Sequence, residues 1–129
     1  MENRYTKQAR EALDAAEVYA KELKHPYIGT EHLLMGLRTS ISGVAAQVLE
    51  MNGLREEDVR KVVGELVSRV GDEPFAGRPK ESPRLKFILE EGRKMAERFR
   101  MPEVGTEHLL LAIVRDTDCV AARILITLN

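Results

Sequence analysis

Gly29-Thr30-Glu31-His32-Leu33-Leu34 recurs letter for letter as Gly105-Thr106-Glu107-His108-Leu109-Leu110, 76 residues further along the chain. At the same offset, thirteen of the 48 aligned positions from Thr6/Ser82 to Gly53/Asn129 are identical, with no gap. Chance matching at ordinary composition would give roughly 3. A sequence that repeats at a fixed offset is typical of duplicated structural units. We therefore expect repeat one over residues 5–70 and repeat two over residues 82–129.

The apolar residues before each copy of the motif recur at helical spacing. Thr6 and Ser82 are well placed as N-caps of two long helices, and Pro83 suits a first helical position. Both helices should end before a proline, Pro26 or Pro102, because a proline disfavours the helical conformation of the residue that precedes it. The predicted apolar stripes are Ala9, Ala12, Leu13, Ala16, Ala20 and Leu23 in the first helix, and Leu85, Ile88, Leu89, Gly92, Ala96 and Phe99 in its counterpart.

A short helix should begin at each Gly-Thr, with Thr30 and Thr106 as its N-caps. The glutamates that follow would lie in the first turn, where the helix dipole favours a negative charge. The small residues of the repeated Val-Ala-Ala segments predict closely packed third helices over about 43–51 and 119–128. A fourth helix is expected over about 55–69.

The stretch 71–81 has two prolines and two glycines and is interpreted as the linker between the repeats. No strand-like alternation is visible. Repeat two lacks a fourth helix, and we expect the protein to continue for about 15 more residues to cover the apolar face of that repeat. The sequence thus predicts an all-α fold. Two pseudo-twofold repeats of a four-helix unit pack as one globular domain, with the last helix of the second repeat missing.

Composition argues against several classes of protein. The 129 residues include 20 basic and 21 acidic residues, for a net charge of −1, so there is no basic excess to bind nucleic acid. The longest apolar runs, such as Leu109 to Val114, are far too short to span a membrane. A single Cys119 and the lack of a visible signal peptide suit a reducing, cytoplasmic location.

No catalytic, cofactor-binding or metal-binding residue is predicted. His32 and His108 follow a glutamate, but Gly36 and Ala112 occupy the i+4 positions where a second helical ligand would be needed. We interpret both histidines as structural and Cys119 as incidental, since no base lies near it in sequence. There is also no phosphate-binding Gly-x-x-x-x-Gly-Lys-[Ser/Thr] loop. The chain is therefore not expected to be an enzyme by itself.

Two four-helix units, each with Gly-Thr-Glu-His-Leu-Leu before a Val-Ala-Ala-x-x-Leu helix, resemble the N-terminal domain of Clp ATPases, and the ClpC type most closely. This resemblance covers nearly the whole chain. It implies that the full-length protein is a hexameric AAA+ unfoldase whose missing ATPase modules bind ATP and Mg and deliver substrates to the ClpP peptidase. The domain, expected to be monomeric alone, would bind protein substrates and adaptors.

Some ClpC domains bind phosphorylated arginine at two equivalent sites, and the glutamates that contact the guanidinium in that family correspond to Glu31 and Glu107. A carboxylate pairs with guanidinium N–H groups through charge-assisted hydrogen bonds. The phosphate needs donors, and the helix N-termini at Thr6 and Ser82 offer them. The backbone around Ile28 and Val104 could line the same sites.

Two alternatives stay open at this point. Glu31 and Glu107 could do no more than stabilise the N-termini of their helices, because an acidic first turn is common. The chain could also be a free-standing Clp-repeat adaptor or scaffold without an ATPase. The sequence beyond this chain would separate that alternative from the first, since an ATPase requires nucleotide-binding motifs.

Overall fold

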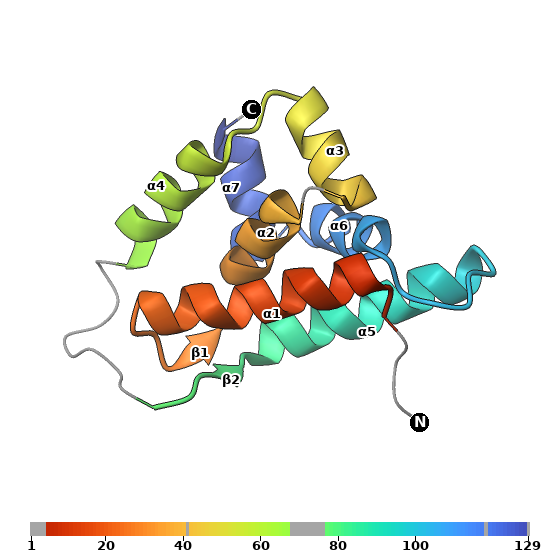
Figure 1. Cartoon of the computed structure of the whole chain (residues 1–129), viewed down its shortest axis with the longest axis horizontal. Helices are drawn as coiled ribbons and strands as arrows, with labels where there is room; N and C mark the ends of the chain where they lie inside the picture. Colours follow the sequence, from red (N-terminus) through yellow and green to blue (C-terminus); the bar gives the residue numbers. More distant parts are fainter. Residues whose placement is uncertain (1–4, 41, 68–76, 118, 129) are drawn as a thin grey trace.

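The computed structural model describes residues 5–40, 42–67, 77–117 and 119–128. Seven helices and two very short strands form within these ranges, which confirms the all-α prediction (Figure 1). Repeat one contains α1 (Lys7–Glu22), β1 (Tyr27–Ile28), α2 (Thr30–Thr39), α3 (Val44–Met51) and α4 (Glu56–Val67). Repeat two contains β2 (Lys80–Glu81), α5 (Pro83–Arg98), α6 (Thr106–Arg115) and α7 (Val120–Leu128). Residues 68–76 and Asn129, which the sequence places in the fourth helix, the linker and the end of repeat two, lie outside the described residues.

The two long helices begin as their capping residues predict. The hydroxyl of Thr6 accepts the N–H of Ala9, and the hydroxyl of Ser82 accepts the N–H of Leu85, each at 3.1 Å. Pro83 occupies the first turn of α5. An N-cap hydroxyl satisfies one of the N–H groups that have no partner inside the helix.

The buried stripes are shorter than predicted. Ala9, Ala12, Ala16 and Ala20 of α1 are fully buried, but Leu23 is 37% exposed and its counterpart Phe99 is 57% exposed. The prediction for these two residues was wrong because α1 ends at Glu22 and α5 ends at Arg98. The last residue of each predicted stripe is therefore the C-cap of its helix.

Small residues allow the helices of each repeat to cross closely. α1 packs against α2, and α5 packs against α6. A Cβ atom at Gly36 of α2 would overlap with the backbone carbonyl oxygen of Ala12. A Cβ atom at Gly92 of α5 would meet only the end of the Leu109 side chain, at 2.8 Å. The α1–α2 crossing is therefore limited by backbone contact, whereas the α5–α6 crossing is limited by a side chain that can move.

Two short backbone pairings connect the repeats, and here the expectation that no strand would form was wrong. β1 and β2 pair in parallel, with Tyr27 opposite Lys80 and Ile28 opposite Glu81. An isolated parallel bridge joins Tyr5 to Val104. These segments are too short for an alternating pattern to be visible in the sequence. Since β2 ends at Glu81, the last residues of the predicted linker belong to this pairing.

Each threonine of the repeated motif caps a helix of the other repeat. Thr106 Oγ1 accepts the N–H of Ala45 in α3, and Thr30 Oγ1 accepts the N–H of Ala121 in α7, each at 3.1 Å. The prediction that these threonines cap their own helices was wrong, because Gly29 and Gly105 are the N-caps of α2 and α6. The repeated motif therefore holds the two halves of the domain together.

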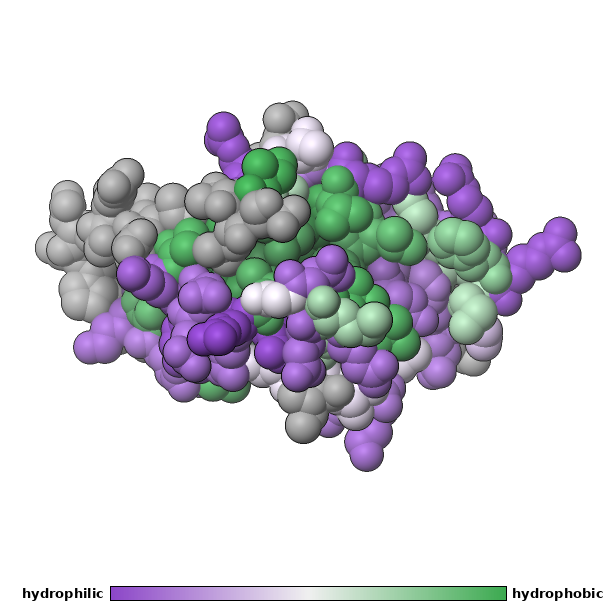
Figure 2. Space-filling view, turned by 90° about the horizontal axis from the view of Figure 1, so that it is seen from above, coloured by the Kyte–Doolittle hydropathy of each residue, from purple (hydrophilic) through white to green (hydrophobic). Residues whose placement is uncertain are grey.

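The core lies between the repeats, and one apolar surface remains open. α4 packs against α2 and α7. By the repeat offset, the equivalent surface is formed by α6 and α3, and an apolar groove of about 260 Å³ lies there. Figure 2 shows apolar side chains gathered on this side of the molecule. The groove is lined mainly by Val48, Leu49, Leu54, Leu110, Val114 and Leu125.

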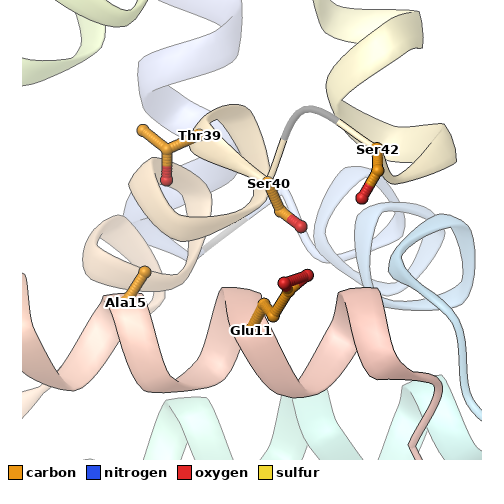
Figure 3. Close-up of a pocket in the computed structure, with 5 residues that line it drawn as sticks. All are labelled: Glu11, Ala15, Thr39, Ser40 and Ser42. Carbon is orange, nitrogen blue, oxygen red and sulfur yellow. The ribbon is translucent and has the colours of Figure 1, made fainter.

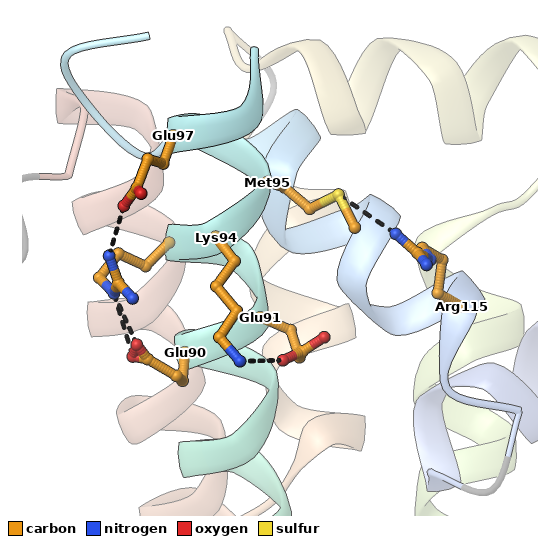
Figure 4. Close-up of polar contacts among 7 residues, drawn as sticks. Glu90, Glu91, Lys94, Met95, Glu97 and Arg115 are labelled. Atoms are coloured by element: carbon orange, nitrogen blue, oxygen red, sulfur yellow. Dashed lines mark hydrogen bonds and ion pairs between the residues drawn. The ribbon is translucent and has the colours of Figure 1, made fainter. Parts of the chain in front are cut away.

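The outer face of α5 is a solvated, charged surface. Arg93 forms ion pairs with Glu90 and Glu97, and Lys94 pairs with Glu91 (Figure 4). Exposed pairs of this kind typically contribute less than about 1 kcal/mol each. None of the helices within the described ranges is long and apolar enough to cross a membrane.

Removing the hydroxyl that caps a helix across the repeats should destabilise the whole domain. We expect Thr106→Val to cost about 1–3 kcal/mol of unfolding free energy, because the buried N–H of Ala45 loses its acceptor. Urea denaturation followed by circular dichroism measures the change. Thr106→Ser keeps the hydroxyl and should cost clearly less, and the exposed Thr117→Val serves as a neutral control. Equal stability of Thr106→Val and the wild type would contradict the assignment.

The two helix crossings should respond differently to an added methyl group. Gly36→Ala should destabilise the domain by about 1–3 kcal/mol, since the methyl group meets backbone that cannot move aside. Gly92→Ala should stay within about 1 kcal/mol of the wild type, because Leu109 can shift and alanine favours the helix. Thermal unfolding of both variants measures the difference. Equal losses would contradict this reading of the crossings.

Candidate functional site

The six residues predicted to bind a ligand come together in two groups of three, and both repeats contribute to each group. We call residues 27–31 with 80–82 junction one, and residues 103–107 with 5–6 junction two. At junction one the N–H of Ser82 donates to the carbonyl of Ile28 at 3.0 Å. At junction two the N–H of Thr6 donates to the carbonyl of Val104 at 2.9 Å. Glu31 therefore belongs with Ser82, and Glu107 belongs with Thr6.

The two junctions lie at opposite ends of α1 (Figure 1). Junction two includes the residues directly before this helix, and junction one includes residues shortly after it. Because α1 has 16 residues, it is about 24 Å long. One small ligand cannot occupy both junctions, but an extended chain with two recognised groups could reach both.

The glutamate of each junction folds back over the glycine that precedes its helix. A Cβ atom at Gly29 would overlap with the carboxylate of Glu31, and one at Gly105 would overlap with the carboxylate of Glu107. A side chain at either position would force the glutamate carboxylate out of the place that it occupies. The glutamates therefore lie at the helix N-termini, where the dipole stabilises their charge.

The histidine after each glutamate completes the turn, which confirms its predicted structural role. His32 Nδ1 accepts the N–H of Gly29 at 2.8 Å, and His108 Nδ1 accepts the N–H of Gly105 at the same distance. Each imidazole thus satisfies a backbone donor just ahead of the helix, as the third residue of a capping box does. Both rings are buried.

Repeat one adds a second histidine to this arrangement. His25 Nδ1 lies 2.8 Å from His32 Nε2. Because His32 Nδ1 accepts a hydrogen bond from the N–H of Gly29, the neutral ring of His32 bears its hydrogen on Nε2, and this N–H donates a hydrogen bond to His25 Nδ1. The hydrogen of neutral His25 is then on Nε2, which is buried and has no hydrogen-bond partner among the described residues. The pair is therefore compatible only with two neutral rings.

Burial opposes charge throughout this cluster. It lowers the pKa of His32 to about 3, with a smaller contribution from neighbouring His25, and it also lowers the pKa of His25. Burial raises the pKa of Glu31, although its own backbone N–H and Tyr27 favour the charged carboxylate. The cause is the same for all three groups, since a low-dielectric surrounding disfavours the charged form of each.

Tyr27 covers the carboxylate of Glu31. Its hydroxyl donates to Glu31 Oε2 at 3.5 Å, a long hydrogen bond, and burial together with this carboxylate raises the pKa of Tyr27. The Tyr27 ring stacks on His25 with ring centroids 5.9 Å apart. Glu31 is consequently only 5% exposed.

Junction two lacks this cover. The positions equivalent to His25 and Tyr27 are Met101 and Glu103, and both side chains are exposed. His108 instead stacks on Phe99, with ring centroids 6.4 Å apart. Glu107 is partly exposed, unlike Glu31. Two identical motifs therefore present their carboxylates differently to a ligand.

The thiol of Cys119 has a structural role that the sequence interpretation missed. The N–H of Ala122 donates to Cys119 Sγ at 3.4 Å, so the sulfur accepts a hydrogen bond in the first turn of α7. Burial raises the pKa of this thiol, which opposes formation of a nucleophilic thiolate. Within the described ranges, no three His, Cys, Asp or Glu side chains gather to hold a metal ion.

A small polar cleft lies away from both junctions, between α1 and the connection from α2 to α3 (Figure 3). It has a volume of about 190 Å³. Glu11 faces Ser40 and Ser42 across it in Figure 3, with Ala15 and Thr39 beside them. Because none of the described polar residues that line it is buried, we place the candidate site at the junctions.

Sequence reasoning missed His25 and Tyr27. The signal that could have found them is the difference between the repeats just before the identical motif, where His25-Pro26-Tyr27 stands opposite Met101-Pro102-Glu103. A sequence comparison that looks for identity discards such positions.

Comparison with known proteins assigns the chain to a family. The model of the Clp repeat (R) N-terminal domain matches residues 4–128. The ATP-dependent Clp protease ATP-binding subunit ClpC of Staphylococcus aureus, strain USA300, is 38% identical over 130 residues, which cover 98% of this chain and 15% of that protein. The same protein of strain NCTC 8325 gives the same values. The chain thus spans about 15% of the length of these relatives.

Solved structures share the fold. The ClpV N-domain in complex with a VipB peptide has a TM-score of 0.78 at 24% identity, and the match covers 97% of this chain and 76% of that one. The N-terminal domain of the chaperone ClpD from Arabidopsis thaliana has a TM-score of 0.75 at 20% identity, covering 97% and 87%. At these identities the structural similarity shows a shared fold, that is, the same arrangement of helices.

The buried histidine pair should make repeat one sensitive to acid. Since the pKa of His32 is about 3 in the folded chain and about 6.5 when unfolded, the unfolded state binds the additional proton between these values. The unfolding free energy should therefore fall as the pH drops below about 6.5, by at most about 1.4 kcal/mol per pH unit for this group. NMR of the imidazole nitrogens should show an Nε2–H tautomer for His32. Titration of folded His32 near pH 6.5 would contradict the assignment.

Proposed function

Because the chain belongs to the Clp repeat (R) N-terminal domain family, we propose that it is a docking domain that binds protein substrates and adaptors. The observation that supports this function best is the pair of junctions, where a glutamate carboxylate lies beside backbone from both repeats. The ClpV N-domain with a VipB peptide provides a related case in which this fold is found with a peptide. In this proposal the domain selects proteins and carries out no reaction.

We extend the proposal to the longer protein by analogy with ClpC. ATPase modules outside this chain would bind ATP and Mg, assemble as a hexamer and pass unfolded substrates to the ClpP peptidase in the cytoplasm. The domain alone would be monomeric. The name of the Staphylococcus aureus relative as an ATP-binding subunit of a Clp protease supports this extension.

The proposed ligand of each junction is a phosphorylated arginine side chain. Its guanidinium requires a carboxylate, and Glu31 or Glu107 supplies one at the start of a helix. Its phosphate requires hydrogen-bond donors, and the first turn of the helix capped by Ser82 or Thr6 provides at least one backbone N–H without a partner inside the helix. Ile28 and Val104 contribute backbone between the two subsites. The positive guanidinium thus meets a carboxylate, and the negative phosphate meets N–H donors.

A ligand role and a capping role for these glutamates differ in their consequences. A carboxylate that only stabilises a helix N-terminus contributes about 0.3–1 kcal/mol to stability and nothing to binding. A carboxylate that receives guanidinium contributes to binding as well. The separation of the junctions by the length of α1 also lets a substrate with two modified arginines bind more tightly than one with a single modification.

Neutralising both glutamates should abolish phosphoarginine binding and leave the fold intact. We expect isothermal titration calorimetry to detect binding to the wild type and none to Glu31→Gln combined with Glu107→Gln. The thermal midpoint should change by only a few degrees, since about 1 kcal/mol of helix-dipole stabilisation is lost at each site at most.

The matched control is Glu57→Gln, which removes an acidic residue from the first turn of another helix, α4. Plain arginine and phosphoserine test whether both parts of the ligand are required. Undiminished phosphoarginine binding by the double variant would contradict the proposed site. If the folded wild type gives no heat with phosphoarginine, the proposal of protein docking stands but phosphoarginine is not the ligand.

A further inference from the structure

We propose that the two junctions are unequal: junction two is the open ligand site, and Tyr27 is the residue that closes junction one. This inference rests on the proposed function, because it concerns the same two carboxylates. It adds a specificity-determining residue that the repeated motif does not contain. The two junctions differ in three ways.

The first difference is the cover over the carboxylate. The Tyr27 hydroxyl donates to Glu31 Oε2 at 3.5 Å, and Glu31 is 5% exposed. A guanidinium that binds both carboxylate oxygens of Glu31 therefore competes with the Tyr27 hydroxyl for Oε2. At junction two the equivalent position is Glu103, whose ionised carboxylate cannot donate a hydrogen bond. Glu107 is partly exposed, and no side-chain hydrogen bond covers it within the described residues.

The second difference is what holds the cover in place. The Tyr27 ring contacts two buried imidazoles, those of His25 and His32, with centroid separations of 5.9 Å in each case. The two imidazoles are joined by a hydrogen bond, and His32 is fixed by the backbone of Gly29. Since this chain of contacts begins at the motif itself, Tyr27 has a rigid support. Met101, which replaces His25 in repeat two, is 48% exposed and gives no comparable support.

The third difference is the number of backbone donors for a phosphate. By helix geometry, the first-turn N–H groups of Lys7 and Gln8 in α1 have no partner inside their helix. In α5 the first of the two equivalent positions is Pro83, which has no N–H. Junction two therefore offers two such donors and junction one offers only that of Arg84. The cover and the donor count both favour junction two.

A test that needs no ligand measures the access to each carboxylate. Coupling of a small amine by a water-soluble carbodiimide at neutral pH, followed by mass spectrometry, gives the modification rate of each glutamate. We expect Glu107 to react at least about fivefold faster than Glu31, the factor that corresponds to one hydrogen bond of about 1 kcal/mol. Tyr27→Ala should raise the rate at Glu31 toward that of Glu107. Equal rates in the wild-type protein would overturn the inference.

A second variant shows whether a changed rate in Tyr27→Ala comes only from a loss of folded structure. Tyr27→Phe keeps the ring on its histidine support and removes only the hydroxyl, so its circular dichroism and melting transition should match those of the wild type. It should raise the Glu31 rate by a smaller factor than Tyr27→Ala. Glu103→Ala, at the equivalent exposed position, should leave the Glu107 rate within about twofold, because no hydrogen bond from that position is lost.

Calorimetry with phosphoarginine then separates this inference from the function on which it rests. Glu107→Gln should weaken the tighter binding event at least about fivefold, whereas Glu31→Gln should leave it unchanged. Tyr27→Ala should strengthen the weaker event. Equal losses from the two glutamine variants would overturn the inequality and leave the proposed function standing. If the wild-type domain binds no phosphoarginine, the proposed function and the inequality of the two sites are both overturned for this ligand. The coupling rates would then show only whether Tyr27 shields Glu31.

Discussion

The structure depends on a reciprocal pair of hydrogen bonds between the repeats, in which Thr106 Oγ1 accepts the N–H of Ala45 and Thr30 Oγ1 accepts the N–H of Ala121. Each repeat thereby supplies a cap for a helix of the other repeat. Gly43, the N-cap of α3, has no side chain, and a Cβ atom there would lie 2.9 Å from Thr106 Oγ1. Gly43 therefore leaves α3 without a side-chain cap of its own and, for the same reason, leaves room for the threonine that caps α3 instead. Neither repeat can satisfy its backbone alone.

The same turns that hold the halves together also create the junctions. The glycine leaves room for the glutamate carboxylate, and the histidine accepts the glycine N–H, so the next residues are held at the start of the helix. The backbone before each turn pairs with the residues ahead of the long helix of the other repeat. A helix N-terminus from one repeat and a carboxylate from the other are thus brought together by the contacts that stabilise the fold, without a separate scaffold for the site.

Divergence between the repeats changes access while it preserves the fold. The capping contacts of the motif are present at the same distances in both halves, but His25 and Tyr27 add a buried polar cluster to only one of them. Such a cluster requires neutral imidazoles, and its cost is an Nε2–H on His25 that has no hydrogen-bond partner among the residues that the structure describes. A duplicated domain can in this way keep one open carboxylate and modify the surroundings of the other, since the threonine caps do not involve residues 25–27.

The amino-acid sequence alone determined the duplication, the helices, the capping hydroxyls of Thr6 and Ser82, and the pairing of candidate residues with a repeated motif, because these follow from local spacing and side-chain chemistry. It did not determine that Thr30 and Thr106 cap the opposite repeat, that 27–28 pairs with 80–81, or that Tyr27 covers Glu31. Those contacts, except the last, join residues far apart in the chain. Even Tyr27 and Glu31, four residues apart, meet because the turn at Gly29 directs both side chains to one place. The periodicity of apolar residues describes a single helix or strand. Which groups form hydrogen bonds with the ends of that element is decided by how the elements pack against one another.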